Sequence, residues 1–160
     1  MSWFVRNVRD GKWWDYGPQG FVSDLIGDDK AQVGVNLFVL GPGEPMAMYH
    51  YEVDQEGFLV LSGEALLIVE DEERLLRQWD YFHCPPNVAH TILGAGFGPA
   101  TILAIGARIG SVGDDWGKYP YSELAMKHNA SAEEDTTDSK VAYARFPEKV
   151  EGEFREEWLP

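Results

Sequence analysis

The feature that most constrains the fold of this chain is a rhythm of short apolar runs between Val33 and Arg108. Each run has the length of a β-strand and is rich in Val, Ile, Leu and Phe. The separators GPGEP, SG, EDEE, PPN and GAGFG are too short to hold crossover helices, so the strands should be antiparallel. This pattern predicts an all-β sandwich or small barrel. The runs are VGVNLFVL, EGFLVLSG, EALLIVE, RLLRQWDYFHC, VAHTILG and PATILAIGAR.

The segment before this rhythm is rich in aromatic residues. The run SWFVRNV has the composition of a strand, and KWWDYGPQGF reads as a turn region. Its two tryptophans, Trp13 and Trp14, are expected to cover the core or to fill an interface, and a stacking platform for a sugar is the sharper alternative. The turn EDEE (Glu70 to Glu73) is expected to be a solvated hairpin tip rather than a cation site.

The segment after Ser111 predicts short helices. SELAMKH opens with a serine that can cap a helix N-terminus, and a second short helix is expected from Asp138 to Phe146, where Pro147 stops it. Val150, Phe154 and Trp158 are four residues apart, which predicts a helical stripe packed on the body of the protein or on a partner subunit. A lid over a ligand pocket is the alternative for this stripe.

Charge and length limit the partners and the compartment. A chain of 160 residues suits one domain. With 13 Lys+Arg against 27 Asp+Glu the formal charge is −14, which repels nucleic acid and anionic membranes. Cys84 is the single cysteine, so no internal disulfide can form, and a buried inert thiol is expected. Without an apolar run of about 18 residues or a signal-like start, we expect a cytoplasmic protein and no membrane span.

The stretch YHYEVDQEGFLVLSG, residues 49–63, places polar residues at alternate positions. Side chains in a strand alternate between its faces, so His50, Glu52, Asp54 and Glu56 would share one face. A metal site and the wet face of an amphipathic strand both give this alternation. Taken alone, the stretch leaves both interpretations open.

A second segment, WDYFHCPPNVAHTILG at residues 79–94, supplies a candidate partner. Pro85, Pro86 and Asn87 predict a rigid turn, and His90 follows at the start of an apolar strand. A lone histidine in such a place is usually a structural residue. The polar residues of the first segment strengthen the interpretation of His90 as a functional residue.

Together the two segments resemble the paired motifs of the cupin superfamily, which are small jelly-roll barrels also described as double-stranded β-helices. The first motif is matched by His50, one residue, Glu52, three residues, Glu56, six residues and Gly63. The second is matched by Asp80, a β-run, the turn at residues 85–87, two residues and His90. The resemblance implies a single cupin domain over residues 1–160, with the barrel core at about 33–108, an N-terminal strand and aromatic segment at 1–32 and a helical C-terminal extension at 111–160.

In metal-binding cupins the residues at these positions hold one divalent ion, so the resemblance implies four ligands in this chain: His50, Glu52, Glu56 and His90. Two imidazoles and two carboxylates suit Mn, Fe, Ni, Co or Zn and leave open positions for substrate. Glu52 stands where the motif has a second histidine, Trp79 replaces a glycine, and Asn87 replaces another. A cupin that has lost its metal, with a merely polar pocket, is the alternative, although two buried carboxylates favour a compensating cation.

The resemblance implies a metal-dependent enzyme on a small polar substrate, of isomerase, epimerase or lyase type, acting on a sugar-like or oxo acid compound. A non-catalytic sensor or storage cupin and an iron-dependent dioxygenase are the alternatives. Tyr51, Asp54 and His83 are candidate acids or bases by their proximity in sequence, and His128 has no assigned role. We also expect a homodimer, because cupins often pair through their sheets.

Overall fold

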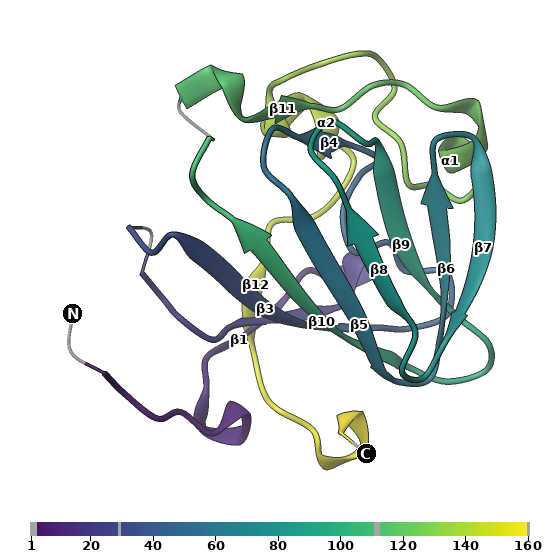
Figure 1. The fold of residues 1–160 in the computed structure, drawn as a ribbon. Helices are drawn as coiled ribbons and strands as arrows, with labels where there is room; N and C mark the ends of the chain where they lie inside the picture. Colours follow the sequence, from purple (N-terminus) through teal and green to yellow (C-terminus); the bar gives the residue numbers. More distant parts are fainter. Residues whose placement is uncertain (1–2, 29, 111–112, 160) are drawn as a thin grey trace.

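The computed structural model describes residues 3–28, 30–110 and 113–159, which form two facing antiparallel sheets and a two-stranded ribbon (Figure 1). Within these residues the larger sheet has the strand order β12 (Val150–Gly152), β1 (Trp13–Asp15), β2 (Phe21–Asp24), β3 (Val33–Leu40), β10 (Ala100–Ala107), β5 (Glu56–Ser62) and β8 (Tyr81–Cys84). The smaller sheet has the order β7 (Glu72–Arg77), β6 (Glu64–Val69) and β9 (His90–Ala95), and the ribbon pairs β11 (Gly117–Lys118) with β4 (Tyr51–Glu52).

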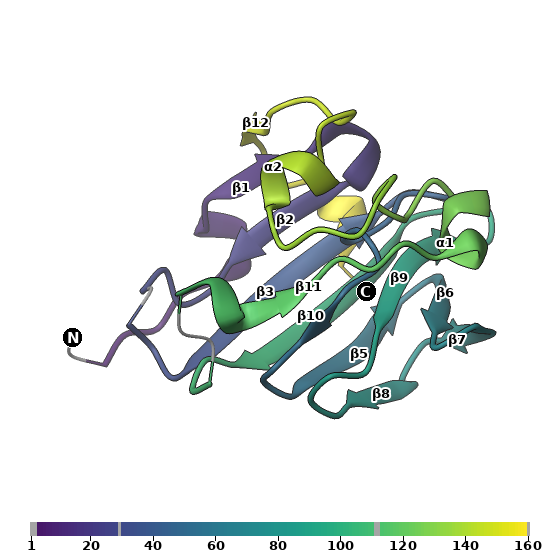
Figure 2. The same cartoon turned by 90° about the horizontal axis from the view of Figure 1, so that it is seen from above.

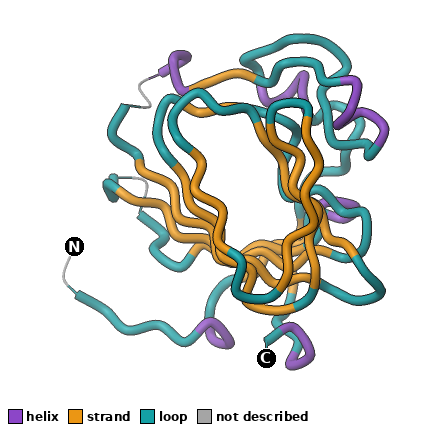
Figure 3. Tube along the Cα trace, turned by 45° about the vertical axis from the view of Figure 1, so that its right-hand side comes forward, coloured by secondary structure: helices purple, strands orange, loops and turns teal. Residues whose placement is uncertain are grey.

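The strands of both sheets curve around a common interior, as Figure 3 shows. Every pairing between named strands is antiparallel, with β10 lying between β3 and β5 and β6 between β7 and β9. The predicted all-β jelly-roll barrel with short C-terminal helices is therefore confirmed. One expected run, RLLRQWDYFHC, divides into β7 and β8, which belong to different sheets.

The central strands are apolar on both faces because both faces are covered. On β3, Leu40 points into the barrel interior, where it packs with Val60, Ile92 and Ile102. The neighbouring Leu37 and Val39 belong to a second core on the outside of the larger sheet. A continuous apolar run is what a strand buried on both faces requires.

The outer core is closed by the two ends of the chain. Trp13, 1% exposed, packs against Trp158 with ring centroids 5.0 Å apart and the rings tilted by 51°, and Phe154 packs beside both. The Thr101 hydroxyl donates to the Trp158 carbonyl and holds the C-terminal segment on the sheet. The expectation that Trp13 covers the core is confirmed.

Two predictions for the chain ends were wrong. The run SWFVRNV forms no strand in its described part: Trp3 to Asn7 are irregular and a 3₁₀ helix follows at Val8–Asp10. The stripe of Val150, Phe154 and Trp158 is not helical, because residues 150–152 pair with β1 and only Glu156–Trp158 form a 3₁₀ turn. Strand pairing and aromatic packing on Trp13 override the local four-residue spacing.

The short C-terminal helices are confirmed in position, although the second is shorter than expected. In α1 (Glu123–Lys127) the Ser122 hydroxyl caps the N-terminus by accepting from the Ala125 N–H. Helix α2 (Ser139–Ala142) is capped by Asp138 and ends four residues before Phe146. Further 3₁₀ turns lie at Gly17–Gln19 and Gly113–Trp116. No helix in the described ranges has the length and hydropathy that a membrane crossing requires.

Several non-glycine residues in turns have a left-handed backbone conformation. Glu70 and Asp71 have φ of 47° and 69°, which makes the acidic β6–β7 tip a two-residue turn of the type that joins twisted strands. Asn87 has φ of 65°, as its place in a glycine position predicted. Trp79 has φ of 73° in the turn between β7 and β8, and its side chain is 66% exposed. A bulky residue in this conformation is strained by about 1–2 kcal/mol.

This strain predicts an inverted order of stability at position 79. Trp79→Gly should be more stable than Trp79→Ala by about 1 kcal/mol, since both lose the exposed indole and only glycine removes the Cβ. At ordinary positions alanine is the more stable of the two. Urea unfolding of both variants measures the difference, and an alanine variant as stable as the glycine variant would contradict the strain.

Candidate metal centre

His50 and His90 face each other across a hydrogen-bonded antiparallel bridge. The His50 N–H donates to the His90 carbonyl at 3.1 Å, and the His90 N–H donates to the His50 carbonyl at 2.8 Å. Side chains directly opposite in such a pair lie on the same face. The two imidazole centroids are accordingly 5.0 Å apart, although the residues are separated by forty positions in the chain.

Each imidazole is oriented by a hydrogen bond to the backbone carbonyl two residues earlier in the chain. The Nδ1 atom of His50 lies 2.7 Å from the Met48 carbonyl, and Nδ1 of His90 lies 3.1 Å from the Val88 carbonyl. A carbonyl can only accept, so Nδ1 carries the proton in both rings. The lone pair of each neutral ring is then on Nε2, which is the arrangement that metal-binding histidines use.

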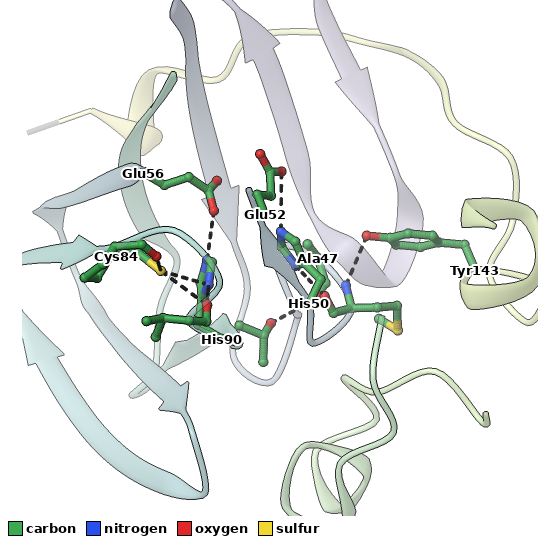
Figure 4. Close-up of polar contacts among 11 residues, drawn as sticks. Ala47, His50, Glu52, Glu56, Cys84, His90 and Tyr143 are labelled. Atoms are coloured by element: carbon green, nitrogen blue, oxygen red, sulfur yellow. Dashed lines mark hydrogen bonds and ion pairs between the residues drawn. The ribbon is translucent and has the colours of Figure 1, made fainter. Parts of the chain in front are cut away.

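Both Nε2 atoms point toward carboxylates, as Figure 4 shows. Nε2 of His90 is 3.5 Å from Glu56 Oε2, and Nε2 of His50 is 3.7 Å from Glu52 Oε1. One ligand atom from each of His50, Glu56 and His90 lies within 4.8 Å of the other two. Glu52 lies beside this three-residue cluster, and its side chain is more exposed than that of Glu56, at 29% against 15%.

All four predicted ligands line one cavity of about 260 Å³, which we call the metal cavity. The metal cavity has room because small residues of β3 and β10 line it. Gly34 on β3 pairs with Gly106 on β10, and Ala104 lies two residues before Gly106. Glu56 is itself the neighbour of Gly106 across the β5–β10 ladder. Deeper in the barrel the same strands carry Leu40 and Ile102, which fill the interior.

Burial and neighbouring charges change the pKa values of Glu56 and His50. Burial, followed by the charge of Glu52, raises the pKa of Glu56 to about 7, although His50 opposes the shift. Burial disfavours the charged form of His50, but the nearby carboxylates of Glu52 and Glu56 outweigh it and raise its pKa. The cavity therefore favours positive charge beside its two carboxylates.

His90 is kept neutral. Burial, reinforced by the nearby His50, lowers the pKa of His90 to about 3. Cys84 lies behind the ring, with Sγ 3.3 Å from His90 Nδ1 and 3.4 Å from the Val88 carbonyl. Burial, with the charges of Glu56 and Glu52, raises the pKa of this thiol to about 12, so the expected buried thiol is confirmed. Sequence reasoning missed that Cys84 supports a histidine.

The remaining sequence candidates lie outside the described lining of the metal cavity. The Asp54 carboxylate accepts from the Ile109 and Gly110 N–H groups, because residues 53–55 bend out of the strand and break the alternation. His83 is exposed, and Tyr51 does not reach the cavity. His128 contacts Glu73 at 2.6 Å on the surface. Expecting Asp54 on the same face as His50 was wrong.

Two tyrosines line the cavity without having been predicted. The ring of Tyr119 lies 5.8 Å from that of His50, and Tyr143 accepts a hydrogen bond from the Met48 N–H. Burial, followed by the influence of Tyr143, raises the pKa of Tyr119, so its hydroxyl stays protonated. Both residues come from the irregular C-terminal segment, where no sequence periodicity connects them with the barrel.

The donor set fits a divalent cation. Two imidazoles whose Nε2 atoms face the cavity and a buried carboxylate form a mixed nitrogen and oxygen set for a transition metal. A cation would also relieve the repulsion that raises the pKa of Glu56. The structural observation that supports this fit is the pair of anchored Nδ1 atoms, which leaves both Nε2 atoms without a competing backbone partner.

Comparison with known proteins agrees with this geometry. The profile of the Cupin domain family matches residues 36–106, the part of the chain that holds the bridge and both motifs. His50, Glu56 and His90 lie within the matched residues, whereas Tyr119 and Tyr143 lie outside them. No curated protein sequence matches the chain significantly.

Solved cupin structures resemble the chain over part of its length. A sugar phosphate isomerase of the cupin superfamily from Silicibacter pomeroyi is 26% identical with a TM-score of 0.56, covering 66% of both chains. A protein from Acidithiobacillus ferrooxidans, provisionally named a sugar phosphate isomerase, is 27% identical with a TM-score of 0.52, covering 57% of this chain and 62% of its own. A cupin 2 domain-containing protein from Halorhodospira halophila, at 17% identity and a TM-score of 0.54, shares the fold. The alignment thus spans slightly less than two thirds of each of the first two proteins.

The proton on Glu56 predicts pH-dependent metal binding. Below a pH of about 7 the carboxyl of Glu56 is protonated, so a cation has to displace that proton. The apparent zinc affinity should rise about tenfold per pH unit for each displaced proton as the pH increases toward 7, and flatten above it. Competition with a chromophoric chelator between pH 5.5 and 8 measures the slope.

The control for this experiment is Glu56→Gln, which removes the titrating carboxyl and should give weaker binding with a shallower slope. An affinity that is constant over this range in the unmodified protein would contradict the assignment of Glu56.

Proposed function

We propose that the protein is a divalent-metal-dependent enzyme of the isomerase type that acts on a small polar substrate with a carbonyl and neighbouring hydroxyl groups. The observation that carries the proposal is the His50, Glu56 and His90 cluster on the wall of a cavity large enough for a small molecule. Glu52 is proposed as the fourth ligand, as the motif match suggested. When bound, the ion would act as a Lewis acid on a substrate oxygen.

The protein's own contribution is to orient these groups and to hold protons. The Met48 and Val88 carbonyls fix the two imidazole rings, so neither has to reorient before ligation. Tyr119 keeps its hydroxyl proton, donates it in a hydrogen bond to the Tyr143 hydroxyl and lies on the cavity wall beside His50. Apolar walls at Phe38 and Phe58 limit the access of water.

The substrate class is supported by the two relatives whose names refer to sugar phosphate isomerases, at 26% and 27% identity. For this chain the class remains a proposal, because the same fold hosts many reactions. The homodimer and the small-molecule ligand expected from the sequence are likewise predictions.

The metal site predicts a specific dependence on cavity carboxylates. Protein purified without a tag or chelator should contain close to one divalent ion per chain, and Glu56→Gln should lower the affinity at least about 100-fold, since loss of an outer-shell partner alone costs 10–100-fold. Glu72→Gln, the same change at an exposed strand position on β7, is the matched control and should retain the metal. Elemental analysis by mass spectrometry gives the content and identity of the ion.

Glu52→Gln tests the fourth ligand separately and should show an intermediate loss. Metal content unaffected in both cavity variants, or the absence of metal after incubation with iron, manganese, nickel, cobalt and zinc, would overturn the proposed site.

The isomerase activity is tested with a panel of aldose and ketose phosphates in deuterium oxide, followed by proton NMR. Isomerisation through a proton transfer next to a carbonyl exchanges that hydrogen with solvent, so we expect loss of one substrate signal together with appearance of the isomer. Both changes should disappear in Glu56→Gln and persist in Glu72→Gln. Saturable binding of panel members without exchange or conversion would favour the non-catalytic binding protein instead.

A further inference from the structure

A second cavity of about 670 Å³ adjoins the metal cavity, and we call it the outer chamber. The two cavities have five lining residues in common, so they share a wall: Asn36, Phe38, Met46, Ala47 and Tyr143. The rest of the outer chamber is formed by Tyr16, Gln19, Val22 and residues between 140 and 149. Its volume lies in the range typical of small-molecule sites.

Apart from the shared wall, the outer chamber is built by parts of the chain that lie outside residues 36–106. Strands β12, β1 and β2 form one edge of the larger sheet, and the segment that holds α2 lies beside them, as Figure 2 shows. Pairing of β1 with β12 joins the two ends of the chain there. The family match at 36–106 therefore covers only the shared wall of this chamber.

One polar side chain in the chamber is buried without a partner. Gln19 is 4% exposed and lines the chamber, yet among the described residues its side-chain amide has no hydrogen bond. No side-chain nitrogen or oxygen of the described residues is both sealed from solvent and unpaired, so the Gln19 amide retains contact with solvent. A polar group of a ligand in the chamber can therefore take the place of water as its hydrogen-bond partner.

The walls combine aromatic surface with positive charge. Phe38, Phe146 and Tyr16 offer rings to an apolar or planar group. Lys149 holds its ammonium 4.6 Å from the ring centroid of Trp14 and 5.5 Å from that of Tyr16, and Lys140 lines the opposite end of the same segment. Within the described residues neither lysine has a carboxylate within 4.0 Å.

The charge of the outer chamber contrasts with that of the molecule. Its charged lining consists of Lys140, Lys149 and Glu148, a net charge of +1 from two lysines and one glutamate, in a chain whose formal charge is −14. The metal cavity has the opposite character, with Glu52 and Glu56 at its centre. This local reversal favours an anionic group in the outer chamber.

We propose that the outer chamber binds the part of the substrate that extends beyond the metal cavity, and that this part carries a ring or other apolar group together with an anionic group such as phosphate or carboxylate. The inference rests on the proposed function, because it assigns the substrate of the same site. It keeps the reacting carbonyl at the His50 and Glu56 end, as in the proposed function, and places the ring and the anion past Tyr143.

Phenyl phosphate is a suitable probe because it combines the ring and the anion, and inorganic phosphate is its control. By isothermal titration calorimetry on the full chain, phenyl phosphate should bind at least tenfold more tightly than phosphate. Lys140→Gln and Lys149→Gln should each weaken phenyl phosphate several-fold, and Gln19→Leu should do the same through loss of the amide. Lys127→Gln, which removes an exposed charge from α1 outside the chamber, is the matched control and should leave the affinity unchanged.

Two further variants separate this inference from the metal site. Ala144→Trp would fill the chamber and should abolish phenyl phosphate binding while the metal content stays unchanged. Glu56→Gln should lose metal and keep phenyl phosphate binding. Circular dichroism spectra and unfolding transitions matching those of the unmodified protein show that each variant is folded.

The outcomes that would overturn the inference are distinct from failure of the metal site. Three results would each contradict a ligand site in the outer chamber. The first is that phenyl phosphate does not bind, and the second is that it binds no more tightly than phosphate. The third is that its binding is lost in Glu56→Gln but unaffected by Ala144→Trp. Weakening in Arg108→Gln alone would assign the anion to the wall of the metal cavity, where Arg108 lies over Gly34. If the protein holds no metal but still binds phenyl phosphate through Gln19 and the lysines, the ligand site in the outer chamber is supported. Only the proposed metal-dependent enzyme is then refuted.

Discussion

The pair of backbone hydrogen bonds between His50 and His90 is the constraint on which the site depends. It joins the loop before β4 to the first residue of β9 and sets the distance between two imidazoles that come from separate motifs. Because the bonded pair fixes both Cβ atoms on one face, only the ring orientation remains to be set, and the Met48 and Val88 carbonyls set it. The centre is therefore organised by backbone geometry before any cation contributes.

The strands around this centre carry large apolar side chains toward one end of the barrel and small side chains beside the histidines. Leu40, Ile102 and Val60 fill the interior toward one end, whereas Gly34, Ala104 and Gly106 leave room beside the histidines. The open part holds two carboxylates, whose mutual repulsion is costly in a low-dielectric site. This part of the fold is less stable than a filled apolar interior would be, and a bound cation would recover the difference. Stability and function are thus linked at Glu56.

Much of the fold could be predicted from sequence because strands and turns leave local signals. The runs at Val33–Leu40 and Ala100–Ala107 are β3 and β10 to within a residue or two, and Asn87 adopts the left-handed backbone that its motif position required. The chain ends could not be predicted in the same way. Trp13 and Trp158 meet through tertiary packing, and a spacing of four residues gives no sign that Val150 pairs with Asp15, a strand residue 135 positions earlier.

For the site, the motif spacing predicted which side chains would meet, and the structure brings all four to one cavity. Strict alternation failed at Asp54, because a bend after Glu52 turns that carboxylate toward the N–H groups of residues 109 and 110. Tyr119, Tyr143 and the outer chamber were missed because they come from irregular segments, whose position is set by packing rather than by a repeat.

The central claim is that His50, Glu56 and His90 hold one cation through Nε2, Nε2 and a carboxylate oxygen. Crystals of the full chain, with diffraction recorded on both sides of the absorption edge of the bound element, test it most directly. The account predicts one anomalous peak in the cavity, about 2.0–2.2 Å from Nε2 of both histidines and from a Glu56 oxygen. A peak coordinated through Nδ1, a peak at other residues, or none in protein soaked with zinc and manganese would contradict it.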